Sequence, residues 1–234
     1  MFENLKVRSQ LILLSGVSLA LFLVALLVAV FALQASITRF QDFIDRDATR
    51  LAAFNEMYAQ GLQSGQALRN IMLDPANRRA YENLDKALAD FDTAFKQANQ
   101  SSAGRADILT ILAKLEELVK QQQKARAAVL AEVSASRLDE ARARLNKEET
   151  PAWRSLKDEL LKGIALLSAA AEQTKQQLAA ENTSKQRQII AVAVAAILAM
   201  LVISGAIARN LLRQLGGEPA AAVFLAQRIA IGEL

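Results

Sequence analysis

The sequence predicts an all-α protein: an antiparallel up-down four-helix bundle whose first and last helices are continuous with two transmembrane helices. Residues 11–33 and 188–208 contain no charged residue, and a helix needs about 20 apolar residues to cross a bilayer. Residues 39–187, between these spans, are rich in helix-forming residue types and poor in Gly and Pro. Their apolar residues recur at steps of three and four, as in amphipathic helices. Because a lone helical pair would leave these apolar faces exposed, we expect a four-helix bundle.

The composition excludes several classes of function. The 234 residues include no Cys and no His, which excludes a disulfide scaffold, a Cys/His zinc site and a nucleophile–imidazole pair. Neither a P-loop nor a dinucleotide-binding glycine motif is present in the sequence. The formal charge is only +4, and no basic run is interleaved with aromatic residues. We therefore expect no enzyme activity, no catalytic residues, no metal, no cofactor and no nucleic-acid partner.

The first span follows a short basic stretch, residues 1–10, which carries Lys6 and Arg8. A cleaved signal peptide is the alternative interpretation, with residues 30–32 (Val-Phe-Ala) as a passable cleavage site. The apolar region of a signal peptide is about 7–15 residues long, and residues 11–33 exceed that length. We therefore expect an uncleaved membrane anchor.

The charges that flank the two spans predict their orientation. Lys6 and Arg8 precede the first span, and Arg209 and Arg213 follow the second. Basic residues favour the cytoplasmic side of a membrane, so both termini are expected in the cytoplasm and residues 39–187 outside it. In a Gram-negative cell this describes a multi-pass protein of the inner membrane with a periplasmic domain.

The first half of this domain predicts two helices. No breaker separates the first span from residues 42–73, so one helix is expected to continue to Leu73. Asp74 is the expected N-cap and Pro75 the expected first residue of a second helix that ends near Asn99. The apolar residues of this second helix are spaced as in a heptad seam. They are Tyr81, Leu84, Leu88, Phe91 and Phe95.

The second half of the domain predicts two more helices. Residues 100–104 combine Ser and Gly and should form a turn, and a third helix is expected over residues 107–133. Residues 134–136 interrupt it, and residues 138–145 form a short helical piece. Residues 150–151 (Thr-Pro) repeat the cap-then-proline signature, so the fourth helix is expected to start there and to run unbroken into the second span.

The two membrane-linked helices have matching predicted lengths. At about 1.5 Å per residue, residues 39–73 and 151–187 would each reach roughly 50–55 Å from the membrane. Helices that end at similar heights leave room for the two shorter helices to fold back between them.

Residues 209–234 follow the second span and are expected in the cytoplasm. Gly216 and Gly217 should break the helix, and Pro219 suits the first turn of a new one. The new helix is amphipathic, so it would lie on the membrane surface or pack on a partner helix. Its few charges favour the partner helix.

Three stretches of the chain carry a resemblance to a known family. The N-terminus contains NLKVRSQLILLSG, a helical bundle lies between two spans, and the C-terminus reads LGGEPAAAVFLAQRIAIGEL. Together they resemble the bacterial methyl-accepting chemotaxis receptors. The C-terminal stretch is similar to the first helix of a HAMP domain, because Pro219 matches the proline of that helix and residues 232–234 (Gly-Glu-Leu) match its closing motif.

The resemblance implies a transmembrane chemoreceptor that works as a homodimer. A stimulus at the periplasmic bundle would shift the last bundle helix, and the shift would pass through the second span to a relay at Gly216, Gly217 and Pro219. No second HAMP helix, methylation region or signalling hairpin follows in the sequence, so we expect a fragment or a naturally short sensory piece. A cytoplasmic kinase and adaptor would be partners only if a signalling region follows Leu234.

Two alternative functions stay open. HAMP helices also follow the second span of sensor kinases, so the chain could be the sensory half of a histidine kinase. The missing output region favours a different class, a non-sensory membrane scaffold whose helical bundle binds partner proteins.

A site for a small organic anion is predicted at the membrane-distal end of the bundle. Arg side chains and helix N-termini bind carboxylates, and such residues gather where the predicted helices start and end. Arg69 is the best placed, because its apolar neighbours predict a partly buried stem. Each Arg has an alternative interpretation as a solubilising surface charge, and Trp153 has one as a core residue. The candidate ligand-binding residues are Arg69, Asn70, Arg78, Tyr81, Trp153 and Arg154.

Comparison with the aspartate receptor of the resembled family bears on the ligand. Alignment of residues 67–74 (ALRNIMLD) places Arg69 on one of that receptor's ligand-binding arginines, and Gln60 and Gly65 on the other two. The resemblance therefore does not support aspartate as the ligand. Gly61 and Gly65 share one face of the helix, where they would either admit another helix, for example across a dimer, or be a tolerated weakness.

Overall fold

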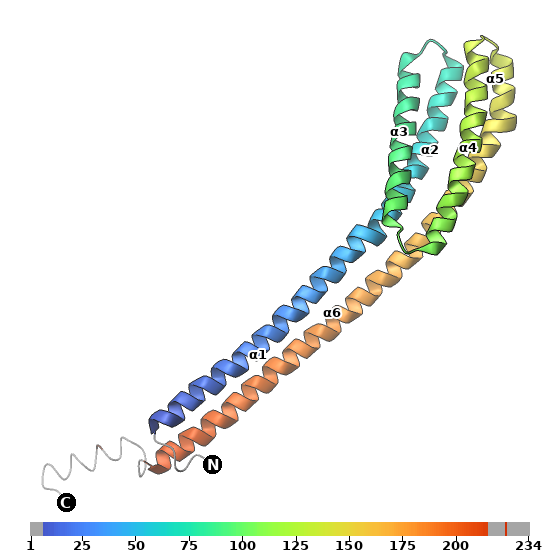
Figure 1. Cartoon of the computed structure of the whole chain (residues 1–234). Helices are drawn as coiled ribbons and strands as arrows, with labels where there is room; N and C mark the ends of the chain where they lie inside the picture. The colour runs from blue at the N-terminus through green and yellow to red at the C-terminus, as the bar shows by residue number, and fades with distance from the viewer. Residues whose placement is uncertain (1–6, 215–222, 224–234) are drawn as a thin grey trace, which may run out of the picture. The chain divides into compact units, whose positions relative to one another are not determined.

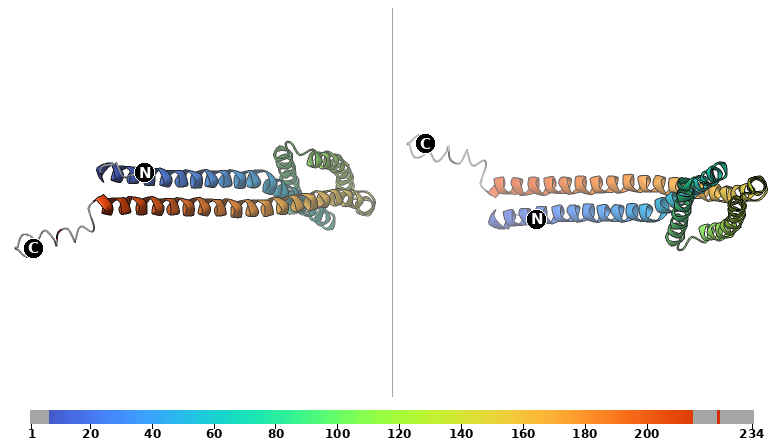
Figure 2. Two further views of the ribbon diagram at one scale, coloured as in Figure 1. Left: turned by 90° about the horizontal axis from the view of Figure 1, so that it is seen from below. Right: turned by 90° about the horizontal axis from the view of Figure 1, so that it is seen from above.

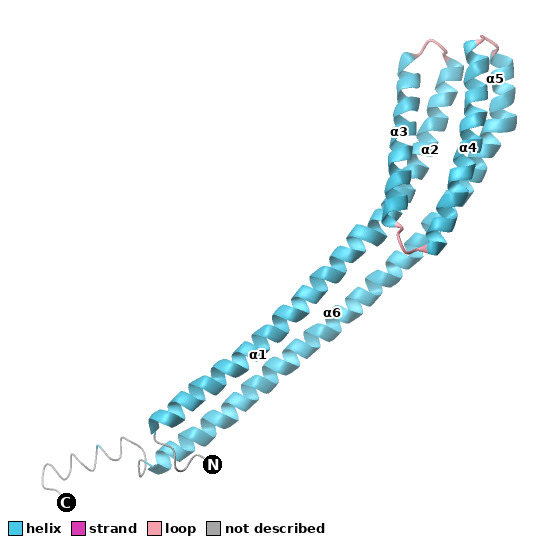
Figure 3. Cartoon of the chain, in the orientation of Figure 1, coloured by secondary structure: helices cyan, strands magenta, loops and turns pink. Residues whose placement is uncertain are grey.

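The structure is a computed structural model that describes residues 7–214 and residue 223. The described residues are helical except in short turns (Figure 3). The predicted relay residues Gly216, Gly217 and Pro219 lie outside the described residues. The helices are α1 (Val7–Asp42), α2 (Thr49–Leu73), α3 (Arg78–Ser101), α4 (Ala106–Ser134), α5 (Leu138–Arg144) and α6 (Thr150–Gln214), with π-helical turns η1 (Phe43–Ala48) and η2 (Leu145–Glu149).

The chain divides into two compact units, and the unit Thr38–Leu178 is a four-helix bundle. The helix α2 pairs with α3, and α4 pairs with the continuous stretch formed by α5, η2 and the start of α6 (Figure 1). The turns between α2 and α3 and between α4 and α5 lie at one end of this unit, which we call the tip. The predicted all-α fold class with a four-helix bundle is confirmed.

The core of the bundle consists of two apolar clusters. The cluster farther from the tip, which we call the base cluster, surrounds Phe54, Leu115 and Leu160, which are fully buried. The tip cluster surrounds Leu68, Leu84 and Val129. All four helical stretches of the bundle contribute to each cluster, because their apolar residues recur at steps of three and four along each helix.

The helices α2 and α6 pack closely through two glycines. A Cβ atom added at Gly61 would overlap the indole ring of Trp153, and one added at Gly163 would overlap the ring of Phe54. Each glycine therefore provides the space that an aromatic side chain of the other helix fills. This explains Gly61 as a site of close helix approach, with the partner helix in the same chain.

The turn between α2 and α3 corrects one predicted helix start. The helix α2 ends at Leu73 as predicted, but α3 begins at Arg78 with Asn77 as its N-cap. The Asn77 side-chain oxygen accepts a hydrogen bond from the Ala80 N–H at 3.2 Å. Asp74 is not the N-cap, because its carboxylate instead accepts from the Ala76 N–H at 3.1 Å and closes the turn.

The helix α6 begins at Thr150 as predicted, but it is not separated from the short helical piece before it. The chain turns back at Ser136, which has a positive φ of 59°, and is helical from Leu138 onward. The π-helical turn η2 joins α5 to α6, so Thr150 and Pro151 lie within one continuous helical stretch. In an α-helix a proline ring clashes with the carbonyl four residues earlier. For Pro151 that carbonyl belongs to Lys147, which lies in the π-helical turn η2.

The second unit contains residues 7–37 and the described residues from 179 onward. Here α1 and the end of α6 lie side by side (Figures 1 and 2), and the Ser36 hydroxyl donates a hydrogen bond to Asn182. Among the described residues, two helices are long and apolar enough to cross a membrane, within Arg8–Leu73 and Leu138–Arg213, and 0% of either apolar window is buried. Such exposed apolar helices are compatible with a membrane protein.

Candidate ligand-binding site

A layer of polar residues separates the base cluster from the tip cluster. Ser64 comes from α2, Gln122 and Arg126 from α4, and Glu149 from η2. All four are buried, and Arg126 is only 6% exposed. We call these four residues the polar layer.

The polar layer occupies positions that continue the apolar face of each helix. On α4, the buried series Leu112, Leu115 and Leu118 continues through Gln122 and Arg126 at helical steps. The same holds for Ser64, which lies between Met57 and Leu68 on the buried face of α2, and for Glu149, one turn after Leu145. The local fold therefore buries these polar groups because their neighbours on the same face are apolar.

Hydrogen bonds connect three members of the polar layer in series. The Arg126 Nη1 donates to the Gln122 Oε1 at 3.4 Å, and the Gln122 Nε2 donates to the Glu149 Oε1 at 3.1 Å. The series joins α4 to the π-helical turn that precedes α6. The second carboxylate oxygen of Glu149 is buried and has no hydrogen-bond partner among the described residues.

Arg126 is a buried cation without a direct counter-ion. No carboxylate of the described residues lies within ion-pair distance of its guanidinium, and its hydrogen bond to Gln122 is long. Burial lowers the pKa of Arg126 from its usual value, and the negative charge of Glu149 acts in the opposite direction. Burying a charge costs several kcal/mol unless a close counter-ion offsets it, and Glu149 acts on Arg126 only across Gln122. Arg126 therefore has an electrostatic preference for an anion in direct contact.

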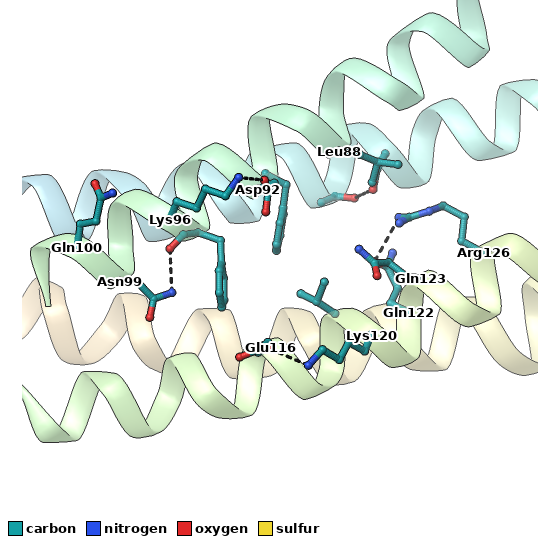
Figure 4. Close-up of a pocket in the computed structure, with 15 residues that line it drawn as sticks. Leu88, Asp92, Lys96, Asn99, Gln100, Glu116, Lys120, Gln122, Gln123 and Arg126 are labelled. Carbon is teal, nitrogen blue, oxygen red and sulfur yellow. Dashed lines mark hydrogen bonds and ion pairs between the residues drawn. The ribbon is translucent and has the colours of Figure 1, made fainter.

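Arg126 lines a cavity of about 640 Å³ between α3 and α4 (Figure 4). Gly61 and Ser64 of α2 also line it. In Figure 4, Arg126 lies near one end of the cavity, and Asn99 and Gln100 lie near the other. Pockets for small ligands have volumes of about 300–1,000 Å³, so the cavity is large enough for a small molecule.

The walls of the cavity are mainly apolar, its rim is charged, and uncharged polar side chains complete the lining (Ser64, Asn99, Gln100, Gln122 and Gln123). Its apolar lining residues are Leu88, Phe91, Phe95 and Val119. The two lysines that line it are neutralised by neighbours on their own helices, because Lys96 pairs with Asp92 at 2.6 Å and Lys120 with Glu116 at 2.7 Å. Arg126 is therefore the one lining cation without a carboxylate partner among the described residues.

The residues predicted for a membrane-distal site do not line this cavity. Arg69 is exposed, and its Nη1 donates to the Gly65 carbonyl of its own helix at 2.9 Å. Asn70 and Arg78 are exposed near the tip turn, and the Tyr81 hydroxyl donates to the Pro75 carbonyl at 3.3 Å.

Trp153 and Arg154 lie apart from the tip turn between α2 and α3. Trp153 is buried in the base cluster, which fits its alternative interpretation as a core residue, and Arg154 is exposed. Four of the six residues therefore lie around the turn between α2 and α3, whereas Trp153 and Arg154 lie elsewhere on the bundle. Ligand binding by the six residues stays a prediction.

The sequence of α4 contains a signal for the polar layer that is independent of the arginines at the helix ends. Gln122 and Arg126 interrupt an apolar series that resumes at Val129 and Val133 with the same spacing. A charged residue in register with a buried face is costly to the fold, so it indicates a functional group or a buried partner.

Comparison with known proteins gives one match. Residues 4–181 match the family model described as a four-helix-bundle sensory module for signal transduction. The match covers the bundle, including every residue of the polar layer and of the cavity. Searches of curated proteins and of solved structures found no match.

Proposed function

Because the chain belongs to the family of four-helix-bundle sensory modules for signal transduction, we propose that it is a transmembrane sensor of the chemoreceptor type. Its stimulus is a small organic anion that binds in the cavity beside Arg126. The observation that carries this proposal is the buried guanidinium of Arg126, which lines a cavity and has no carboxylate partner among the described residues. An incoming carboxylate would supply the missing counter-ion through charge-assisted hydrogen bonds.

The polar layer offers a route from the ligand to α6. An anion on Arg126 competes with Gln122 for the guanidinium, and Gln122 is also the donor to Glu149. Glu149 ends the π-helical turn η2, which leads directly into α6. Loss or strengthening of these hydrogen bonds would shift the equilibrium of η2 between a π-helical and an α-helical turn. Turns of the π-helical type are frequent at functional sites.

A change in η2 would be carried along one continuous helix. The helix α6 runs unbroken from Thr150 to Gln214, and its apolar second half is the proposed second membrane span. In this proposal the bundle is periplasmic, both termini are cytoplasmic, and the protein works as a homodimer in the inner membrane. The output passes to the HAMP-like segment at Gly216, Gly217 and Pro219, and reaches a kinase and adaptor only if a signalling region follows Leu234.

The test of this proposal is anion binding by the full chain in lipid nanodiscs. Isothermal titration calorimetry with a panel of organic carboxylates is expected to identify at least one that binds. Arg126→Gln keeps a hydrogen-bonding side chain but removes the charge, and should weaken that binding by about tenfold or more.

Arg69→Gln is the matched control, because it removes an exposed guanidinium of the same bundle. It should leave the affinity unchanged. Loss of binding in Arg69→Gln with normal binding in Arg126→Gln would move the site to the tip and contradict the proposed cavity. Circular dichroism melts of both variants establish that each remains folded.

A further inference from the structure

We infer that the cavity takes an elongated apolar monocarboxylate, specifically an aromatic acid longer than a single ring. This inference rests on the proposed function and names the chemical class of its ligand. It depends on three observations: the length of the cavity, the chemistry of its walls, and the state of each charged group that lines it.

The cavity is elongated along the axes of α3 and α4. Its lining residues on α3 extend from Leu88 to Gln100, which corresponds to about 18 Å of helix, and those on α4 extend from Glu116 to Arg126, about 15 Å. Arg126 lies near one end. A ligand that reaches Arg126 and fills the space beyond it must therefore be long, with its anionic group at one end.

The space beyond Arg126 is apolar and partly aromatic. The rings of Phe91 and Phe95 come from successive turns of α3, and Val119 lines the opposite wall on α4. Aromatic rings prefer offset or edge-to-face contacts with other rings, and these contacts add to the free energy gained from apolar burial. An aromatic body fits these walls. The amide side chains of Asn99 and Gln100 lie near the end of the cavity opposite Arg126, so a hydroxyl-rich or highly charged body would lose hydration against the apolar walls between the two ends.

The charged groups of the cavity admit one negative charge. The lysines Lys96 and Lys120 are already paired with Asp92 and Glu116. A second carboxylate on the ligand would have to break one of these pairs. The same pairs occupy the lining carboxylates, so an ammonium group has no ready partner. A monocarboxylate fits this arrangement better than a dicarboxylate or an amino acid.

The test compares four probes against the full chain in lipid nanodiscs, with empty nanodiscs as the reference for partition into lipid. Biphenyl-4-carboxylate carries the proposed charge and body. Biphenyl-4-carboxamide has the same shape without the charge, acetate has the charge without the body, and succinate has two charges and no rings. We expect biphenyl-4-carboxylate to bind at least about tenfold more tightly than each of the other three.

Two variants test whether this selectivity comes from the cavity. Arg126→Gln should reduce the preference for the carboxylate over the carboxamide to less than about threefold, because the charge that distinguishes them is gone. Phe95→Leu keeps the wall apolar and removes a ring, so it should weaken biphenyl-4-carboxylate severalfold and leave the melting temperature close to that of the wild type. Arg69→Gln is again the control and should change neither affinity.

The outcomes separate this inference from the proposed function. If succinate or acetate binds more tightly than biphenyl-4-carboxylate and depends on Arg126, the ligand class is wrong and the proposed site stands. If biphenyl-4-carboxylate binds equally well to wild type, Arg126→Gln and Phe95→Leu, its binding lies elsewhere and the inference is overturned. Failure of biphenyl-4-carboxylate to bind also overturns it, even if another anion later restores the proposed function.

Discussion

Gly61 is a position at which a single methyl group should change the stability of the bundle. An added Cβ would overlap the buried indole of Trp153, so Gly61→Ala forces the ring or the helix to move. We expect this overpacking to lower the free energy of unfolding by about 1–3 kcal/mol. Thermal or denaturant unfolding followed by circular dichroism measures the change.

Gly65→Ala is the matched control, four residues further along the same helix. There an added Cβ would meet only the end of the flexible Arg69 side chain, at 3.0 Å. Alanine is favoured over glycine in a helix by up to about 1 kcal/mol, so Gly65→Ala should be neutral or stabilising. Equal destabilisation by both substitutions would contradict the close packing of Trp153 on Gly61.

Gly61 and Gly65 show what could and what could not be predicted from the spacing of residues in the sequence. Their spacing correctly indicated a shared face on α2, and Gly61 does admit an aromatic side chain from another helix. The pattern could not distinguish a helix of the same chain from a helix of a partner. That distinction depends on Trp153, which is nearly a hundred positions away in the sequence and reaches Gly61 only through the fold.

Asp107 should make the stability of the bundle depend on pH in the acid range. Arg105 donates to both of its carboxylate oxygens, at 3.0 and 2.8 Å, and this hydrogen bonding lowers the pKa of Asp107 from 3.8 to about 2. Because the folded pKa lies below the unfolded pKa, the contribution is fully present above about pH 4 and is lost as the pH falls through about 2. The carboxylate is largely exposed, so the effect is small.

Asp107→Asn measures this contribution. Melting temperatures of the wild type and of Asp107→Asn should differ slightly at pH 5 to 7, with the wild type the more stable, and should converge as the pH approaches 2. A difference that stays constant down to pH 2 would mean that the Asp107 carboxylate does not carry it.

The polar layer connects two elements, α4 and η2, at a cost in stability. Replacing buried hydrogen-bonded charges by apolar residues of similar size is often stabilising, by about 1–4 kcal/mol. The triple variant Gln122→Leu, Arg126→Met and Glu149→Leu should therefore unfold at a higher temperature than the wild type. It should also fail to bind an anion, because it lacks the guanidinium.

The single variant Arg126→Met should behave in the opposite way. It leaves Glu149 buried without a nearby positive charge and leaves the Gln122 carbonyl without its donor, so we expect a loss of roughly 1–3 kcal/mol. Unfolding of both variants beside the wild type tests this contrast. A single variant as stable as the triple variant would show that the layer carries no electrostatic penalty.

Helix identity could be predicted from the sequence, whereas the start of α3 and the continuity of α5 with α6 could not. The end of α2 at Leu73 follows from the Asp-Pro pair after it, but Asp74 and Asn77 are both suitable caps and lie within one turn of each other. The structure uses Asn77. Likewise, Thr150-Pro151 has a local signature for a helix start, yet η2 lets the helix continue past the proline. In both cases the local sequence permits two structures, and the packing of the neighbouring helices determines which one forms.

The candidate site could not be predicted because it is a property of the assembled bundle. Each helix taken alone shows only one or two polar or small residues on an otherwise apolar face. Their common height appears when Ser64, Gln122 and Glu149 are brought to one level by the helix pairing. The site predicted from the sequence consists of residues at helix ends, such as Arg69. It does not include Arg126, which lies in the middle of the buried face of α4.

The proposed membrane topology is testable with single cysteines, because the natural sequence contains none. Ala135→Cys places a thiol in the exposed turn between α4 and α5, and Ser9→Cys places one near the start of α1. In spheroplasts of an expressing bacterium, a membrane-impermeant maleimide should label Ala135→Cys directly and Ser9→Cys only after permeabilisation. The reverse pattern would contradict a periplasmic bundle with a cytoplasmic N-terminus.

The packing of Trp153 on Gly61 also gives the protein a built-in optical reporter. Trp153 is the single tryptophan of the chain, and Gly61, whose backbone its ring covers, lines the cavity beside Arg126. We therefore expect a molecule that enters the cavity to change the surroundings of the one indole fluorophore. The emission spectrum of Trp153 should then report occupancy in the unmodified protein, without a label, on the timescale of the binding event itself.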